Sequence, residues 1–177
     1  IVTCPFTCER KLTKPIHVPV STYVSTERCL PRFKIALVIC QEIYEDEHFH
    51  KLYAPQNDGK ALSAALKEID FEVLAFTNIT LAEMVNALDM FCAFIDSNTY
   101  ALFYFNGHAI GHGSDMYFAF RDTMLNNATQ PLEEQLLWHG TIETRLDACS
   151  PLLCVVIYDS CRDDPPSTIA DKIRETC

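Results

Sequence analysis

Leu152 to Tyr158 reads LLCVVIY and runs directly into Asp159-Ser160-Cys161-Arg162. An earlier apolar run, Ala101 to Phe105 (ALFYF), leads in the same way into Asn106-Gly107-His108. Fully apolar runs of this length are typical of strands buried on both faces of a parallel sheet, where ligands and chemistry collect at the carboxyl ends of the strands. If the two strands are neighbours, a thiol and an imidazole share one edge of the sheet, and this pair is the minimum that a cysteine hydrolase needs.

Cys161 differs from the other cysteines in its surroundings. The chain has nine cysteines, and an arbitrary free cysteine is more often a buried core residue than a nucleophile. Cys161 lies beyond its apolar run, next to Arg162, in a polar and proline-rich stretch where exposure is expected and a nearby cation favours the thiolate. Three other cysteines lie inside apolar patterns, and we interpret them as core residues: Cys40, Cys92 and Cys154.

The length and charge of the chain limit its organisation and its partners. The 177 residues fit one domain with a substantial core, and no apolar run is long enough to span a membrane. A net charge of −10 argues against nucleic acid or an anionic membrane as partner. Residues 1–32 hold four of the nine prolines and show no helical period, so we interpret them as a linker or the tail of a preceding domain, and residues 33–177 as the domain itself.

The cysteine pattern also bears on location and on metals. Nine is an odd number and no CxxC pair occurs, which indicates reduced thiols in a cytoplasmic protein rather than a disulfide framework. Cys4, Cys8 and His17 lack the spacing of a four-ligand zinc site. Because the chain also lacks GxxxxGK and GxGxxG, we expect neither a metal nor another cofactor.

Strands and helices alternate from residue 33 onward. The cleanest helix signal is a capping box at Thr80 to Glu83, followed by an apolar stripe that ends at Ile95. The expected strands are Phe33 to Ile39, Phe71 to Phe76, Ala101 to Phe105, Met116 to Phe120 and Leu152 to Tyr158, and the other expected helices are Gly59 to Ile69, Pro131 to Leu137 and Thr168 to Glu175. This order predicts an α/β fold, a doubly wound and mainly parallel sheet with helices on both faces.

The geometry of a Cys and His pair leaves the identity of the histidine open. His108 directly follows a buried strand, and His112 lies four residues further on. Either imidazole would take the thiol proton and later protonate the leaving amine. The oxyanion would need backbone donors, most simply the amides near Gly107 to Ala109 and that of Cys161.

These motifs resemble the caspase-like cysteine proteases of clan CD, and within them the paracaspases of the lymphoid signalling type. The resemblance runs from about Lys34 to about Arg162 and is carried by KIALVI, KLYAP, IDFEVLAFTNIT, TYALFYFNGH and YDSCR. It implies a cysteine endopeptidase in intracellular signalling, with His108 as the catalytic histidine and Cys161 as the nucleophile. Ala109 and Cys40 stand where the family usually has glycine; Ala109 still offers its amide to the oxyanion.

The resemblance also implies a specificity. Caspases proper hold an aspartate of the substrate with arginines, but the loop from Tyr44 to Asp58 contains no arginine. Asp58 and Asp159 match positions that help form an acidic pocket for arginine in paracaspases, and a guanidinium requires such carboxylates. Asp58 could instead be the N-cap of the helix that starts at Gly59, and Asp159 could merely orient its loop. We expect cleavage after Arg, with Lys tolerated poorly.

Only sixteen residues follow Cys161, so the chain corresponds to the large-subunit portion of the family, and the smaller-subunit region that completes the sheet is missing. The resemblance implies protein substrates with Arg before the cut, homodimerisation and adaptor proteins of signalling assemblies as partners. The alternative is a catalytically silent caspase-like scaffold or regulatory interaction module, because the family's substrate groove needs the missing region. A third interpretation is a generic doubly wound domain in which the Cys and His are incidental.

Overall fold

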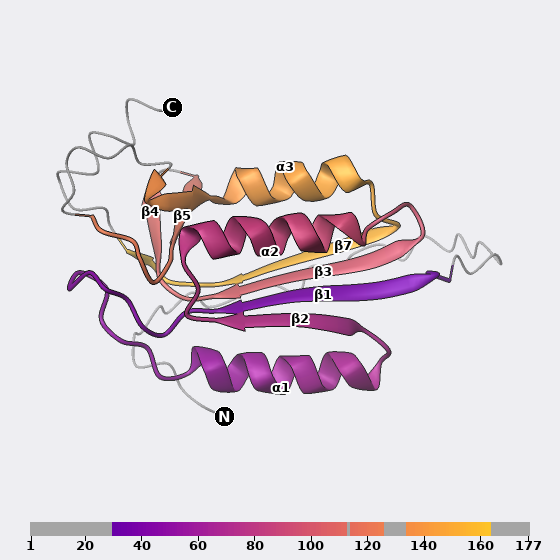
Figure 1. Ribbon diagram of the computed structural model, residues 1–177, viewed down its shortest axis with the longest axis horizontal. Helices are drawn as coiled ribbons and strands as arrows, with labels where there is room; N and C mark the ends of the chain where they lie inside the picture. The colour runs from indigo at the N-terminus through magenta and orange to yellow at the C-terminus, as the bar shows by residue number, and fades with distance from the viewer. Residues whose placement is uncertain (1–29, 113, 126–133, 164–177) are drawn as a thin grey trace, which may run out of the picture.

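The computed structural model describes residues 30–112, 114–125 and 134–163. Its centre is a parallel sheet with the strand order β2-β1-β3-β7 (Figure 1). The strands are β1 (Phe33–Cys40), β2 (Glu72–Thr77), β3 (Thr99–Asn106) and β7 (Leu153–Asp159). The two strands that precede His108 and Cys161 are therefore direct neighbours, as the sequence predicted. The expectation that both are buried on both faces is wrong for β7, because β7 is an outer strand of the described sheet and its Leu153, Val155 and Ile157 side chains are exposed on one face.

Helices cover both faces of this sheet. Helix α1 (Pro55–Glu68) lies on one face, and α2 (Leu81–Ala93) and α3 (His139–Cys149) lie on the other (Figure 1). The expected doubly wound α/β architecture is confirmed. None of these helices, within the described residues, is long and apolar enough to cross a membrane.

A second, smaller sheet continues from the ends of β3 and β7. It has the order β6-β5-β4-β8, with β4 (Ala109–His112), β5 (Asp115–Ala119), β6 (Leu136–Trp138) and β8 (Arg162–Asp163). Strands β4 and β8 are parallel, whereas β4 with β5 and β5 with β6 are antiparallel. The short strand expected near Met116 is confirmed as β5.

Two expectations about helices are wrong. Leu136 and Leu137, expected to end a helix, belong to β6, where they are buried and pair with β5; the helix follows at His139. Helix α1 begins at Pro55 rather than Gly59, because proline suits a first helical position. The helix expected over Thr168 to Glu175 lies outside the described residues.

Helix α2 fixes the face of the sheet opposite α1. The side chain of Thr80 accepts from the amide of Glu83, and the Glu83 carboxylate accepts from the amide of Thr80, so the predicted capping box is present. Met84, Leu88 and Phe91 are fully buried in the core that this helix shares with β1 and β3. Burial of each such side chain contributes about 1.5–3 kcal/mol, which holds the strands in one register.

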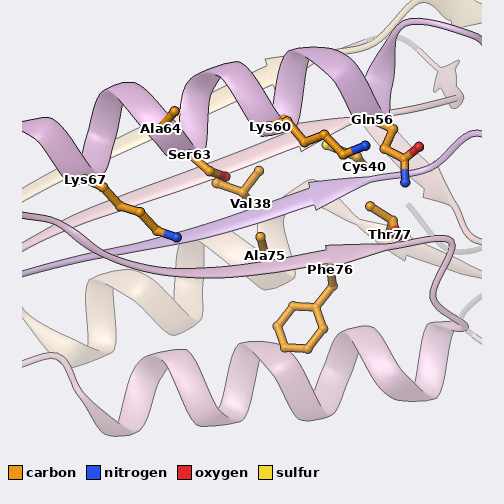
Figure 2. Close-up of a pocket in the computed structure, with 11 residues that line it drawn as sticks. Val38, Cys40, Gln56, Lys60, Ser63, Ala64, Lys67, Ala75, Phe76 and Thr77 are labelled. Atoms are coloured by element: carbon orange, nitrogen blue, oxygen red, sulfur yellow. The ribbon is translucent and has the colours of Figure 1, made fainter.

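Helix α1 packs closely against β1 where Gly59 passes over Cys40. A Cβ atom at Gly59 would overlap the Cys40 Sγ atom. Figure 2 shows the Cys40 side chain beneath this helix. The Cys40 sulfur thus occupies the volume that a side chain at position 59 would need.

This contact gives a testable pair of variants. Gly59→Ala should lower the free energy of unfolding by about 1–3 kcal/mol through overpacking, although alanine is normally the better helix former. In a Cys40→Ala background the same change should be neutral or stabilising, because the sulfur is gone. A double-mutant cycle measured by urea unfolding checks this coupling, and additive effects would contradict the close contact.

Candidate active site

The registers of the two sheets align the segments that contain His108 and Cys161. In β3 and β7 Asn106 pairs with Asp159, and in β4 and β8 Ala109 pairs with Arg162. The partners are 53 positions apart in both pairs. Because the offset is the same on both sides of the intervening residues, we infer that the backbone of Cys161 lies opposite that of His108, at the spacing of about 4.8 Å that separates adjacent strands.

The His108 ring is buried and held in one orientation by a backbone carbonyl. His108 is 4 % exposed, and its Nε2 atom lies 2.8 Å from the carbonyl oxygen of His50. Because a carbonyl can only accept, we assign the hydrogen of the neutral ring to Nε2. Nδ1 is then the nitrogen that accepts a proton.

Aromatic side chains of the loop after β1 surround the His108 ring. Its ring centroid lies 5.0 Å from that of Tyr44, 5.4 Å from that of Phe49 and 4.6 Å from that of His50. Tyr44 and Phe49 also contact each other, with centroids 5.3 Å apart. These contacts fix the plane of the imidazole.

The backbone of His108 is also engaged. Its amide donates to the Tyr44 hydroxyl at 2.8 Å, and its carbonyl accepts from the Ala119 amide at 3.1 Å. The His108 amide is therefore occupied and does not serve an oxyanion. The proposed donors at Ala109 and Cys161 stay predictions; Ala109 lies at the start of β4 and is fully buried.

His112, the alternative imidazole, ends β4 and pairs with Asp115. Its backbone is thus at the end of β4 remote from β3, whereas His108 immediately precedes that strand. In the register of β4 and β8 Ala109 pairs with Arg162, so His108 and Cys161 each directly precede this first pair, whereas His112 lies beyond the last one.

Asp46 clamps the loop that supplies the His50 carbonyl. Its side chain is 1 % exposed and accepts from the His48 amide, the His48 ring and the Leu125 amide. Burial alone would raise the pKa of Asp46, but these donors outweigh it and hold the pKa below its usual range. The carboxylate is therefore a charged anchor between two loops.

The lowered pKa of Asp46 predicts that the stability of the fold depends on pH. A carboxyl group whose pKa is depressed by folding stabilises the fold above its unfolded pKa, and this contribution is lost as pH falls through the folded pKa. Asp46→Asn should lower the free energy of unfolding by about 2 kcal/mol at pH 7, because hydrogen bonds to a charged group are lost. Urea unfolding at neutral and acid pH checks this: the variant should lose less stability on acidification than the wild type, and parallel losses would contradict it.

The thiols differ in exposure. Among the five cysteines of the described residues, Cys161 alone is exposed. Burial raises the pKa of Cys40 to about 11 and that of Cys92 to about 12, and it also raises the pKa of Cys154. These three thiols remain protonated at neutral pH, which fits their interpretation as core or partly buried packing residues.

Asp58 and Asp159 meet at the carboxyl ends of the strands. Asp58 comes from the first turn of α1, and Asp159 ends β7. The Asn106 Nδ2 atom lies 3.5 Å from Asp58 Oδ2 and 3.3 Å from Asp159 Oδ2, and the Tyr104 hydroxyl donates to Asp159 Oδ2 at 3.0 Å. Asp58 is not an N-cap, because α1 starts earlier with Ala54 in that position.

A separate cavity of about 350 Å³ lies between α1 and the strands β1 and β2 (Figure 2). Its polar lining includes Gln56, Lys60, Ser63 and Lys67, and its only thiol is that of Cys40. The raised pKa of Cys40 makes this sulfur a poor nucleophile, and no histidine lines the cavity. We therefore do not expect cysteine chemistry in this cavity. No cluster of three or more His, Cys, Asp or Glu side chains in the described ranges could hold a metal ion.

Sequence reasoning missed several residues around His108. The His50 carbonyl is a backbone group and leaves no trace in residue identity. Tyr44 and Phe49 lie in a loop with no periodic pattern, and Asn106 was read only as the end of a strand motif. The aromatic content of the loop was the one signal that pointed to a packed rather than a solvated segment.

A parallel sheet with this order, extended by a small antiparallel sheet and carrying a thiol and an imidazole at adjoining strand ends, defines a caspase-like α/β domain. The Caspase domain family matches residues 33–176, and the chain belongs to that family. The fold agrees with the Drosophila initiator caspase Dronc, with a TM-score of 0.59 at 17% identity over 90% of this chain and 66% of the other. It also agrees with protein GSU0716 of Geobacter sulfurreducens, with a TM-score of 0.58 at 17% identity over 75% of this chain and 52% of the other.

Two curated relatives support the resemblance to paracaspases. The chain is 36% identical over 84 residues to human mucosa-associated lymphoid tissue lymphoma translocation protein 1, which is 48% of this chain and 10% of the relative. The mouse homolog is 36% identical over 83 residues, 47% of this chain and 10% of the relative. The chain thus spans about a tenth of the length of these relatives. The caspase-like, paracaspase-type assignment made from the sequence is confirmed.

Proposed function

We propose that the chain carries the catalytic residues of a cysteine endopeptidase that cleaves proteins after Arg. Cys161 is the nucleophile and His108 is the base. The observation that supports the proposal is the equal offset of 53 positions in the paired segments on either side of these two residues, together with the exposure of Cys161 and the burial of His108.

The chemistry follows from the orientation of the ring. Nδ1 of His108 takes the proton of the Cys161 thiol, and the sulfur attacks the scissile carbonyl carbon. The amides of Ala109 and Cys161 bind the oxyanion. The imidazolium then protonates the leaving amine, which leaves a thioester that water hydrolyses. The His50 carbonyl accepts from Nε2 throughout, and this bond strengthens while the ring is charged.

Asp58 and Asp159 supply the specificity. Two carboxylates that converge beside the site suit a guanidinium, whose planar fork binds carboxylates in pairs. The acidity of the chain, with a net charge of −10, favours approach of basic segments. Substrates are therefore proteins with Arg before the cut.

A silent scaffold is the second candidate, and the edge of the sheet favours it. Strand β7 is an outer strand of the described sheet, and Leu153, Val155 and Ile157 are 47%, 37% and 39% exposed on it. Because these three side chains lie on one face of the strand, they form an apolar surface that suits contact with another part of the protein or with a partner. Homodimerisation, adaptor proteins as partners and a signalling role in the cytoplasm are likewise proposals, because the chain spans only about a tenth of the length of its curated relatives.

Matched peptides that differ only at the residue before the cut test the proposal. In the full-length protein we expect Arg to be cleaved best, Lys about 10–100-fold less efficiently and citrulline or Asp hardly at all, because citrulline keeps the shape but loses the charge. Preference for Asp would contradict the acidic pocket. A thiol-reactive probe carrying arginine that fails to label the full-length protein would instead favour the scaffold.

A further inference from the structure

Asn106 lies at the point where the two carboxylates of the proposed pocket meet. It ends β3, is 7% exposed and directs its side-chain nitrogen toward both Asp58 and Asp159. We propose that Asn106 is a positioning residue that holds Asp58 and Asp159 as a pair and thereby sets preference for Arg over Lys. This inference rests on the proposed cleavage after Arg.

The hydrogen bonds fix the orientation of the amide. The two hydrogens of Nδ2 face three acceptors: Tyr104 Oη at 3.1 Å, Asp159 Oδ2 at 3.3 Å and Asp58 Oδ2 at 3.5 Å. Carboxylate oxygens only accept, so the nitrogen and not the oxygen of the amide must lie on this side. The Asn106 amide therefore shares its two hydrogens among the Tyr104 hydroxyl and the two carboxylates, and it lies within hydrogen-bond distance of both acids.

The two acids depend on Asn106 to different degrees. Asp159 also receives the Tyr104 hydroxyl, and burial raises the pKa of Tyr104, so that hydroxyl keeps its proton. The Asp58 carboxylate has no other hydrogen-bond donor among the residues that the structure describes. Loss of the Asn106 amide would free Asp58 and leave Asp159 still anchored.

Anchoring through one oxygen leaves the other for a ligand. Asp58 and Asp159 each bind Asn106 through Oδ2, and neither Oδ1 atom has a hydrogen-bond partner within the described ranges. Two oxygens held at a set spacing suit the rigid fork of a guanidinium, whereas a lysine ammonium is compact and gains less from a fixed pair. A neutral donor between the acids also offsets their mutual repulsion.

The test measures kcat/KM of the full-length protein on Arg and Lys peptides for Asn106→Leu, which keeps the size of the side chain but removes its donors. The Arg value should fall about 30-fold, mainly through KM, and the Lys value much less, so that the Arg:Lys ratio falls about tenfold. Tyr104→Phe is the matched control: it leaves the bond between Asn106 and Asp58 and should change the ratio less than threefold, roughly. Alkylation of Cys161 by iodoacetamide, which needs no pocket, should be unchanged in both variants.

The outcomes separate this inference from the proposed function. Wild-type protein that does not prefer Arg would overturn both. A wild-type preference for Arg that survives in folded Asn106→Leu would overturn the inference alone. If that variant does not fold, Asn106→Asp gives the same decision: the Arg:Lys ratio should fall at neutral pH and recover on acidification, when the new carboxyl group is protonated and donates again, and a ratio equal to that of the wild type at all pH values would overturn the inference.

Discussion

Cys161→Ala should reduce kcat/KM on an arginine peptide at least about 1000-fold in the full-length protein, because no other described thiol is exposed beside a histidine. The variant should unfold at the same urea concentration as the wild type, since an exposed sulfur contributes little packing. The matched control is Cys149→Ala, which removes a thiol on α3 and should keep full activity.

His108→Ala should cause a loss of similar size, and the double variant should be hardly worse than either single one. Residues that act as one unit are not additive, because removing either member disables the same step. Activity that survives in His108→Ala would show that another group activates Cys161. Losses that multiply in the double variant would contradict joint action of the two side chains.

The second large effect is expected at the acidic pair. Asp58→Asn combined with Asp159→Asn should lower kcat/KM on the arginine peptide about 100-fold, since each lost charge pair at a partly solvated site costs roughly tenfold. The citrulline peptide should be cleaved equally by wild type and variant, because it carries no charge to recognise. Comparison of the two peptides by steady-state kinetics therefore separates loss of specificity from loss of the catalytic residues.

Asp147→Asn serves as the control for this pair. It removes an exposed carboxylate from α3 and changes net charge by the same step as either single variant. Its Arg cleavage should be unchanged. An equal loss in Asp147→Asn would mean that overall charge, and not the pair at the strand ends, governs the preference.

The strands and the helix α2 were predictable because their signals are local and strong. The runs ALFYF and LLCVVIY are apolar at every position, which is typical of strands, and the capping box at Thr80 marks the residue after which α2 begins. The sheet edge shared by His108 and Cys161 follows from the parallel arrangement alone. The small sheet did not follow: β6 is three residues long and is a strand only because β5 pairs with it. Helix α3 has no side-chain cap, so its first residue could not be predicted from a local sequence signal.

The side chains of the candidate site could be predicted from the sequence, but the backbone groups that hold them could not. Position after a strand singled out His108, Cys161 and Asp159, whose placement depends on the sheet. The His50 carbonyl and the bonds of Asn106 depend on how two loops close over the sheet, which residue type does not encode. The role of Asp46 could not be predicted for the same reason, because its hydrogen-bond partners lie in separate loops.

The most direct measurement of the central claim is a chemical cross-link between the two side chains. 1,3-Dibromoacetone, a short reagent with an alkylating carbon at each end, joins a thiol to an imidazole only when both lie within its reach. Mass spectrometry of the digested wild-type protein should find the Cys161 peptide bridged to the His108 peptide, and His108→Ala should give only the one-armed adduct of Cys161. A bridge from Cys161 to another histidine, or a one-armed adduct in the folded wild type, would contradict the pairing of the two residues.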